Sequence, residues 1–127
     1  MHGTKRLGLT LLLAGGVCLP TANAHAALDA TGQREVQALL AFVGASHCTF
    51  IRNGSSHTAA DAQSHLQEKL DYLERRNLVN SAEDFIERVA SQSSISGEPY
   101  KVNCDGRERL SADWLGEELQ HLRQVQP

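Results

Sequence analysis

Apolar residues in the segment from 30 to 43 recur with the spacing of one helical face. They occupy positions i, i+3, i+4 and i+7, which is the pattern of an amphipathic helix with a single buried stripe. Gly44 follows directly and favours the end of the helix there. The residues of the stripe are Val36, Leu39, Leu40 and Val43.

Three further helices are predicted from capping residues that precede apolar positions at helical spacing. Thr58 and Asp61 have the form of a capping box, and a helix then continues to about residue 76. Ser81 and Asp84 form a second such box before a shorter helix, and Ser111 begins the last one. The inward-facing residues are Ala62, Leu66, Leu70 and Leu73 in the first, Phe85, Ile86, Val89 and Ala90 in the second, and Leu115, Leu119 and Leu122 in the third.

Two short segments alternate with the period of a strand instead. The first, residues 48–51, precedes an Asn-Gly turn, and the second, residues 100–104, precedes an Asp-Gly turn. The chain shows no repeat or linker that would divide it. We therefore predict a mostly helical α+β fold, with about four helices packed against a short two-stranded β element.

The first 26 residues have the pattern of an export signal. Two basic residues precede an apolar run, Pro20 ends the run, and small residues allow cleavage after Ala24 or Ala26. The run is shorter than the roughly 20 apolar residues that span a bilayer. We predict a signal peptide over residues 1–26, followed by a single small exported domain over residues 27–127. We expect this domain to be periplasmic, with no membrane anchor after cleavage.

The two cysteines that follow this signal, Cys48 and Cys104, point to a disulfide. In an oxidising compartment such a pair is typical of a structural bridge, and a loop this long makes the bridge worth about 4 kcal/mol. Two buried thiols or part of a metal site are the alternatives. His47 is the neighbouring ligand that a metal site would use, and it is too little to favour one.

The negative net charge of the chain disfavours nucleic acid as a partner. The chain carries a net charge of −3, and removal of the signal takes away two basic residues and no acidic one, which leaves −5. Binding of nucleic acid without sequence preference requires clustered basic residues. We therefore expect no nucleic-acid partner, and we expect a monomer.

Polar residues from several segments are predicted to form one binding site. Arg52 lies at the junction of a strand and a turn, and its planar guanidinium suits a carboxylate or a phosphate. His65 and Lys69 lie one helical turn apart. The serine-rich segment 91–100 adds hydroxyl donors for an anion or a sugar. The candidate ligand-binding residues are Arg52, Asn53, His65, Lys69, Ser91, Ser94, Ser96, Gly97 and Tyr100.

A structural interpretation of these residues stays open. Serines that follow a helix often cap its carbonyls and fill turns, and His65 could bond to a backbone carbonyl. The helix face of His57, Asp61 and His65 has a spacing that some zinc sites use, but His57 precedes the capping Thr58. We expect no metal and no cofactor.

Three stretches of the chain carry a family resemblance. They are "CTFIRNGSSHTAADAQSHLQEKL", "SAEDFIERVASQSSISGEPY" and "WLGEEL". In this order they resemble a small family of exported bacterial proteins of unknown function, the YfeK-like family, over roughly residues 47–119. The resemblance implies export and a shared fold, and it implies no activity.

The function that we predict first is non-catalytic binding of an anionic or sugar-like cell-envelope ligand, or of a protein partner. One alternative is a small envelope hydrolase in which His65 activates a loop serine, although the chain has no Gly-x-Ser-x-Gly elbow. A second alternative follows from the segment Ser96-Gly-Glu-Pro-Tyr100, which is similar to the Ser-Gly-x-x-Tyr loop of periplasmic lysozyme inhibitors. Those inhibitors are β-barrels, whereas this chain is expected to be mostly helical.

Overall fold

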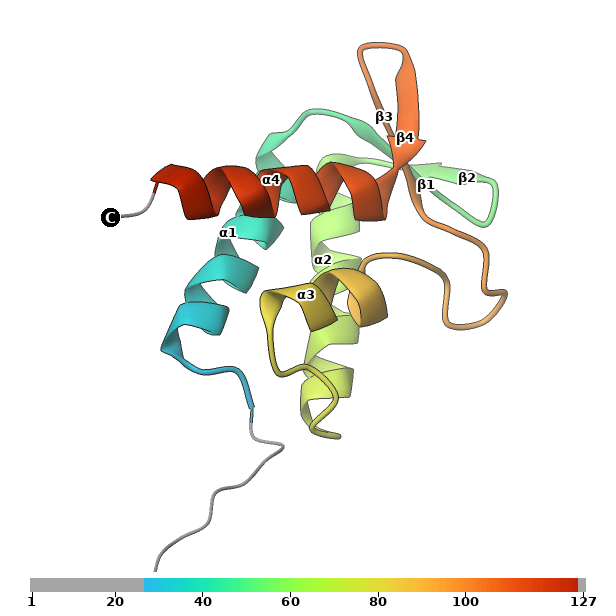
Figure 1. Ribbon diagram of the computed structural model, residues 1–127. Coiled ribbons are helices and arrows are strands. Elements are labelled where there is room, and N and C mark those ends of the chain that lie inside the picture. The colour runs from blue at the N-terminus through green and yellow to red at the C-terminus, as the bar shows by residue number, and fades with distance from the viewer. Residues whose placement is uncertain (1–26, 126–127) are drawn as a thin grey trace, which may run out of the picture.

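The computed structural model describes residues 27–125, so the predicted signal peptide lies outside the described residues. Within that range the chain is mostly helical and adds one antiparallel sheet (Figure 1), which confirms the predicted α+β class. The elements are α1 (Ala30–Ala45), β1 (Thr49–Arg52), β2 (Ser55–His57), α2 (Ala59–Glu74), α3 (Ala82–Asp84), η1 (Phe85–Val89), β3 (Lys101–Cys104), β4 (Arg107–Leu110) and α4 (Ser111–Val125). No helix among these residues has the length and apolar character needed to cross a membrane.

The helix starts follow the predicted capping boxes. The Thr58 hydroxyl accepts the backbone N–H of Asp61 at 3.1 Å, and the Ser81 hydroxyl accepts that of Asp84 at 3.0 Å. The helix that Ser81 caps, α3, changes its hydrogen-bond pattern after one turn. The N–H of Ala90 donates to the carbonyl of Phe85, five residues earlier, at 3.0 Å. This π-helical turn, η1, continues α3 directly.

The sheet has four strands in the order β2-β1-β3-β4, where two were expected. Both predicted turns close hairpins: Asn53 and Gly54 have φ of 52° and 79°, and Asp105 and Gly106 have φ of 55° and 83°. Positive φ at both central residues matches the twist of paired strands, so the chain returns and pairs after each turn. The returning strands read Ser-Ser-His and Arg-Glu-Arg-Leu and are largely exposed, so no apolar alternation announces them.

The pairing of β1 with β3 confirms the predicted disulfide. These strands lie antiparallel with Phe50 opposite Val102. Continuing that register by two residues places Cys48 opposite Cys104, and the two are bonded with their Cα atoms 4.6 Å apart. The bridge therefore joins neighbouring strands that are 56 residues apart in sequence.

The helices cover one face of this sheet and enclose the core. Phe50 and Val102, on that face, are buried together with Trp114 and Leu115 of α4. The Trp114 ring lies 5.6 Å from that of Phe50, edge to face. The predicted stripe of α1 forms the centre of the core, and the side chains with no exposure are Val36, Leu39, Val43, Phe85, Val89 and Val102.

An ion-pair network fastens three helices at the side away from the sheet. Glu35 of α1 is only 4% exposed, and its carboxylate accepts two hydrogen bonds from Arg123 of α4 at 2.9 and 3.0 Å. The same guanidinium donates to Glu83 of α3 at 2.6 and 3.1 Å. The buried carboxylate is thus matched by a charge-assisted pair.

Candidate functional site

The pairing of β1 with β3, which brings the two cysteines together at one end, also positions the candidate site at the other end of these strands. Two residues beyond Phe50 and Val102, Arg52 lies opposite Tyr100. Because side chains alternate along a strand, Arg52 and Tyr100 lie on the same face as the buried Phe50, the face that the helices cover. On α2, His65 and Lys69 lie one turn apart and face this pair.

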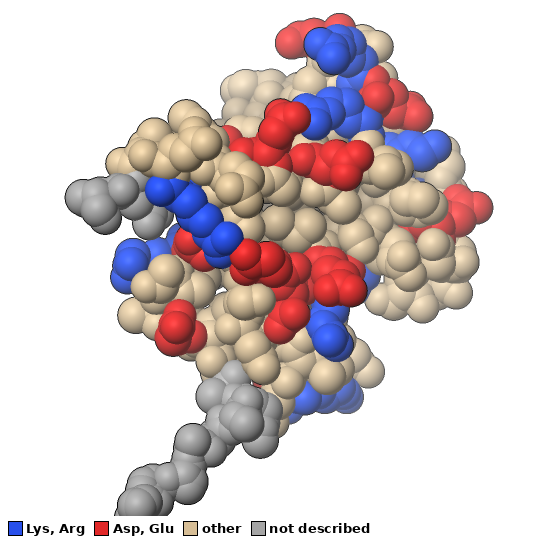
Figure 2. Space-filling view, in the orientation of Figure 1, with Lys and Arg blue, Asp and Glu red and all other residues tan. Residues whose placement is uncertain are grey.

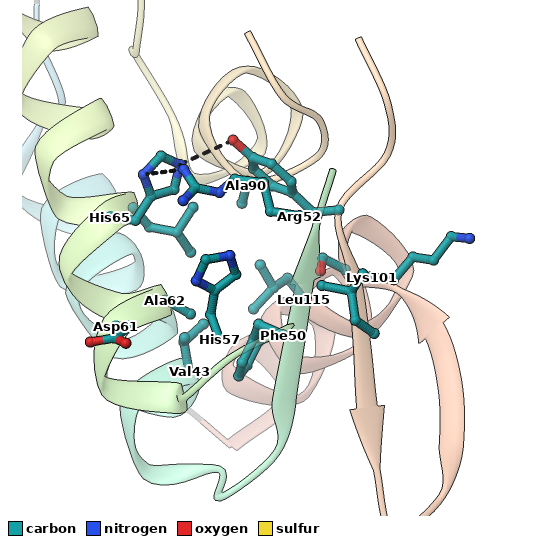
Figure 3. A pocket seen from close by; sticks show the side chains of 14 residues that line it. Val43, Phe50, Arg52, His57, Asp61, Ala62, His65, Ala90, Lys101 and Leu115 are labelled. Atoms are coloured by element: carbon teal, nitrogen blue, oxygen red, sulfur yellow. Dashed lines mark hydrogen bonds between the residues drawn. The ribbon is translucent and has the colours of Figure 1, made fainter. Parts of the chain in front are cut away.

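Hydrogen-bond contacts join these four side chains in a row, from Arg52 through His65 and Tyr100 to Lys69, and we call them the basic cluster. Nη1 of Arg52 lies 3.0 Å from Nδ1 of His65 (Figure 3), and Nε2 of His65 lies 3.2 Å from the Tyr100 hydroxyl. Lys69 donates to the same hydroxyl at 3.2 Å and to the carbonyl of Gln92 at 2.7 Å. The sequence prediction that these residues meet is therefore correct in its geometry.

The hydrogen bonds of the cluster assign a protonation state to His65. Arginine can only donate, so a ring nitrogen of His65 accepts from Arg52, whose Nη1 lies 3.0 Å from Nδ1 and 3.2 Å from Nε2, and a neutral ring supplies that acceptor. The Tyr100 oxygen accepts from Lys69 and also lies within hydrogen-bond distance of Nε2 of His65. The cluster consequently presents donors and no anionic group.

The pKa values agree with this assignment. Burial, together with the positive charges of Arg52 and Lys69, lowers the pKa of His65. Burial and the charge of Arg52 lower the pKa of Lys69. Within residues 27–125 the ion pairs involve other basic side chains, and neither Arg52 nor Lys69 takes part in one. Two half-buried cations therefore stand together with no carboxylate bonded to either.

A cavity of about 260 Å³ adjoins the basic cluster. Arg52, His65 and Tyr100 line the end beside the cluster, and His57 lines it farther along. Figure 3 shows the His57 ring projecting into the space between Ala62 and Phe50. The rest of the wall is mainly apolar and comes from the three long helices, the sheet and the end of η1: Val43, Phe50, Ala62, Leu66, Ala90 and Leu115.

His57 has a polar atom that the described residues leave without a partner. Its Nε2 is buried, and nothing in residues 27–125 hydrogen-bonds to it. Buried polar atoms are nearly always hydrogen-bonded, so such an atom calls for an explanation. We considered His57 only as a metal ligand from the sequence, and recognising residues 55–57 as a strand would have found it, because His57 pairs with the buried Phe50.

The serine-rich segment 91–100 is fixed to the turn after β1. Asn53 donates to the Ser93 hydroxyl at 3.2 Å, and the Ser96 hydroxyl donates to the side-chain oxygen of Asn53. Ser93 is buried and also accepts the N–H groups of Ile95 and Ser96 at 3.2 and 3.3 Å. Ser91 donates to the carbonyl of Glu87 at 2.7 Å. These serines have the structural role that was the alternative interpretation.

The expected single polar pocket is divided in two. Arg52, His65 and Tyr100 line the cavity, whereas Lys69, Ser91, Ser94 and Gly97 line an open groove. Tyr100 is buried, and Lys69 turns toward the carbonyl of Gln92 on the groove side. The structure therefore does not bring Ser91 and Ser94 into one pocket with Arg52 and His65.

Two other chemistries find no geometric support in the described residues. The hydrogen-bond partners of His65 are Arg52 and Tyr100, so no loop serine lies where His65 could activate it. Within residues 27–125 no group of three or more His, Cys, Asp or Glu side chains is placed to hold a metal ion.

Comparison with known proteins supports the resemblance seen in the sequence. The model of a family described as "Family of unknown function (DUF5329)" matches residues 30–123. The chain is also 42% identical over 83 residues to "Uncharacterized protein YfeK" of Salmonella typhimurium, which covers 65% of this chain and 68% of that protein. No solved structure matches at a significant level. Since the family model covers most of the chain, this protein belongs to the DUF5329 family, whose function is unknown.

Proposed function

We propose that this protein is a non-catalytic binding domain of the periplasm, which recognises an anionic ligand of the cell envelope through the basic cluster. The observation that carries the proposal is the pair of half-buried cations, Arg52 and Lys69, that have no carboxylate partner among residues 27–125. Burial of a charge is unfavourable unless the charge is paired. A bound anion would supply the missing partner.

The arrangement of donors suits a carboxylate or a similar oxyanion. Arg52 offers a planar fork of N–H groups, of which one is used on His65. Hydrogen bonds between ionised partners are roughly twice as strong as neutral ones, and partial burial weakens the competition from water.

The positive charge of the basic cluster is confined to a small part of the surface. Figure 2 shows acidic side chains over the face formed by α3 and α4, where Glu83, Glu87 and Glu117 are exposed. Two of these glutamates, Glu83 and Glu117, are paired with Arg123 and Arg109, and the net charge of the chain is −3. Specific binding at the basic cluster therefore depends on short-range contacts and not on attraction by the net charge.

Titration with acetate and with sulfate at constant ionic strength tests this proposal, with backbone amide NMR signals as the readout. We expect saturable shifts for the amides of β1, of α2 near His65 and of Tyr100. Arg52→Gln should abolish them. Arg75→Gln is the matched control, because Arg75 is an exposed arginine at the C-terminal end of α2, the helix that carries His65 and Lys69. This variant should leave the shifts unchanged. Equal shifts in both variants, or no saturable shift in the wild type, would refute the proposal.

A protein partner is the second candidate, and the tip of the serine-rich segment favours it. Ile95 is 95% exposed, and the connection from η1 to β3 extends away from the helices (Figure 1). Tyr100 is buried in the cluster, so the inhibitor-like string could act only through its exposed part, residues 96–99. Inhibition of lysozyme that is lost in Ile95→Asp and Ser96→Ala would support this candidate, and no inhibition by the wild type would dismiss it.

A further inference from the structure

We infer that the ligand is amphipathic: an organic monoanion whose charged group binds Arg52, whose apolar body of about one ring fills the adjoining cavity, and whose hydroxyl group bonds to His57. This inference rests on the proposed function and adds the chemical class of the ligand. Three independent features of the cavity carry it.

The first feature is the composition of the wall. Beyond the end formed by Arg52, His65 and Tyr100, the lining is mainly apolar and includes Val43, Phe50 and Leu115. Asp61 and Lys101 also belong to the lining, and Figure 3 shows their charged groups pointing away from the space. Sugars and inorganic oxyanions are hydrogen-bonded over their whole surface in water, and this wall cannot replace those bonds. An apolar body loses nothing there and gains the free energy of leaving water.

The second feature is size. The cavity measures about 260 Å³. A cavity of about 150 Å³ lined by aliphatic and aromatic side chains accommodates benzene in another protein. The space beside the basic cluster therefore admits one ring with a small substituent, and it lies below the range of roughly 300–1,000 Å³ typical of sites for drug-sized molecules.

The third feature is the unsatisfied nitrogen of His57. Its Nε2 is buried in the cavity wall without a hydrogen-bond partner among residues 27–125. A hydroxyl group both donates and accepts, so it pairs with either tautomer of a neutral imidazole. Because Nε2 has almost no accessible surface, a ligand hydroxyl reaches it once the imidazole turns toward the cavity. That hydrogen bond would remove the cost of the unsatisfied nitrogen and would fix the orientation of the ligand ring.

Arg52 connects these features into one site. The guanidinium lines the cavity and also contacts His65 of the cluster, so a carboxylate bonded to it lies at the cavity end. The body attached to that carboxylate then extends along the apolar wall toward His57.

NMR titration with three probes of increasing complexity tests the inference on the oxidised protein: acetate, benzoate and the hydroxybenzoate isomers. Benzoate has the charge of acetate and adds a ring, so we expect it to bind at least about tenfold more tightly. At least one hydroxybenzoate should bind several-fold more tightly than benzoate, since a net hydrogen bond contributes about a factor of five. His57→Phe should bring the affinity of every hydroxybenzoate down to the affinity of benzoate measured in the same variant.

The outcomes separate this inference from the proposed function. If acetate and benzoate bind with equal affinity and both depend on Arg52, the inference is overturned and the anion site stands. If neither binds, both fail. If no hydroxybenzoate exceeds benzoate, or its advantage survives His57→Phe, the role assigned to His57 is wrong.

Filling the cavity gives a further control. Ala62→Leu places a larger side chain on the cavity wall, and it should reduce benzoate affinity to the affinity of acetate measured in the same variant. Because Ala62 is 9% exposed and the larger residue could disturb folding, the wild type supplies the decisive measurement. We expect nuclear Overhauser contacts from the ring protons of bound benzoate to the methyl groups of Val43, Leu66 and Leu115. Saturable benzoate binding without these contacts would place the ring elsewhere and overturn the inference.

Discussion

At the scale of single residues, the state of His65 decides how the basic cluster behaves. The ring accepts a hydrogen bond from Arg52, which requires the neutral form, and its Nε2 lies 3.2 Å from the Tyr100 hydroxyl. Burial is the largest cause of its lowered pKa, followed by the charges of Arg52 and Lys69, while Glu68 acts in the opposite direction. Near pH 7 the cluster therefore carries two positive charges and a neutral imidazole.

Acidification should strengthen the binding of an anion that does not itself titrate, such as sulfate. As the pH falls through the lowered pKa of His65, the ring gains a positive charge and loses the lone pair that accepts from Arg52. By linkage, bound sulfate should raise the pKa of His65. Histidine ring signals followed by NMR with and without sulfate measure both effects, and a pKa that sulfate leaves unchanged would contradict them.

The same shift has a consequence for stability. An unfolded histidine titrates near pH 6.5, above the pKa of His65 in the folded chain. The unfolded chain therefore takes up its proton first, and the contribution of His65 to the free energy of unfolding falls as the pH drops from about 6.5. The free energy of unfolding, measured by denaturant titration between pH 7 and pH 5, should therefore fall more steeply with decreasing pH in the wild type than in His65→Gln. Equal pH dependence in the two proteins would contradict this expectation.

At the scale of elements, the signals that the sequence displays locally were sufficient for helices and turns. The capping boxes at Thr58 and Ser81 and both Gly-containing turns are present as predicted. Strands β2 and β4 were missed because they are short and polar, and backbone pairing holds them rather than a buried face. The cavity was missed for the same reason: His57 enters it only because β2 exists.

The connection between η1 and β3 depends on one serine more than on its neighbours. The Ser93 hydroxyl bonds to Asn53 and to two backbone N–H groups, and the residue is 4% exposed. Ser93→Ala should lower the free energy of unfolding by about 1–3 kcal/mol, because three partly buried hydrogen bonds lose their acceptor. Ser94→Ala is the control, since Ser94 is exposed, and it should have little effect in the same denaturant titration. Equal effects would show that these bonds do not stabilise the loop.

At the scale of the whole molecule, a disulfide and an ion-pair network link the strands and the helices around the site. The disulfide joins β1 to β3 at the end opposite Arg52 and Tyr100, and Arg123 ties α4 to α1 and α3. The sequence indicated the disulfide from its two cysteines. The Arg123 network could not be predicted from the sequence. Glu35 and Arg123 are 88 residues apart, and no local pattern in either helix marks them as partners.

Removing Arg123 should be far more harmful than removing another paired arginine. Arg123→Ala leaves the buried carboxylate of Glu35 without its donor, and we expect a loss of roughly 2–4 kcal/mol in the free energy of unfolding. Arg109 makes a two-bond pair with Glu117 of similar length, at 3.1 and 2.8 Å, on an exposed surface. Arg109→Ala should therefore have a small effect by comparison. Similar losses in both variants would mean that burial of Glu35 does not matter.

Replacing both Cys48 and Cys104 by serine should cost about 4 kcal/mol, because the bridge closes a long loop in the unfolded chain. Since the pairing of β1 with β3 also aligns Arg52 with Tyr100, the loss should be accompanied by weaker anion binding. Unfolding and sulfate titration of the double variant measure the two effects. Unchanged stability would contradict the structural role of the bridge.

The most direct test of the account observes the guanidinium and imidazole nitrogens themselves. We expect acetate to shift the side-chain ¹⁵N signals of Arg52 and His65 in a saturable manner, while those of Arg75 and Arg123 stay in place. If every arginine shifts alike, or if Arg52 does not respond, the basic cluster is not an anion site and the proposed function is wrong.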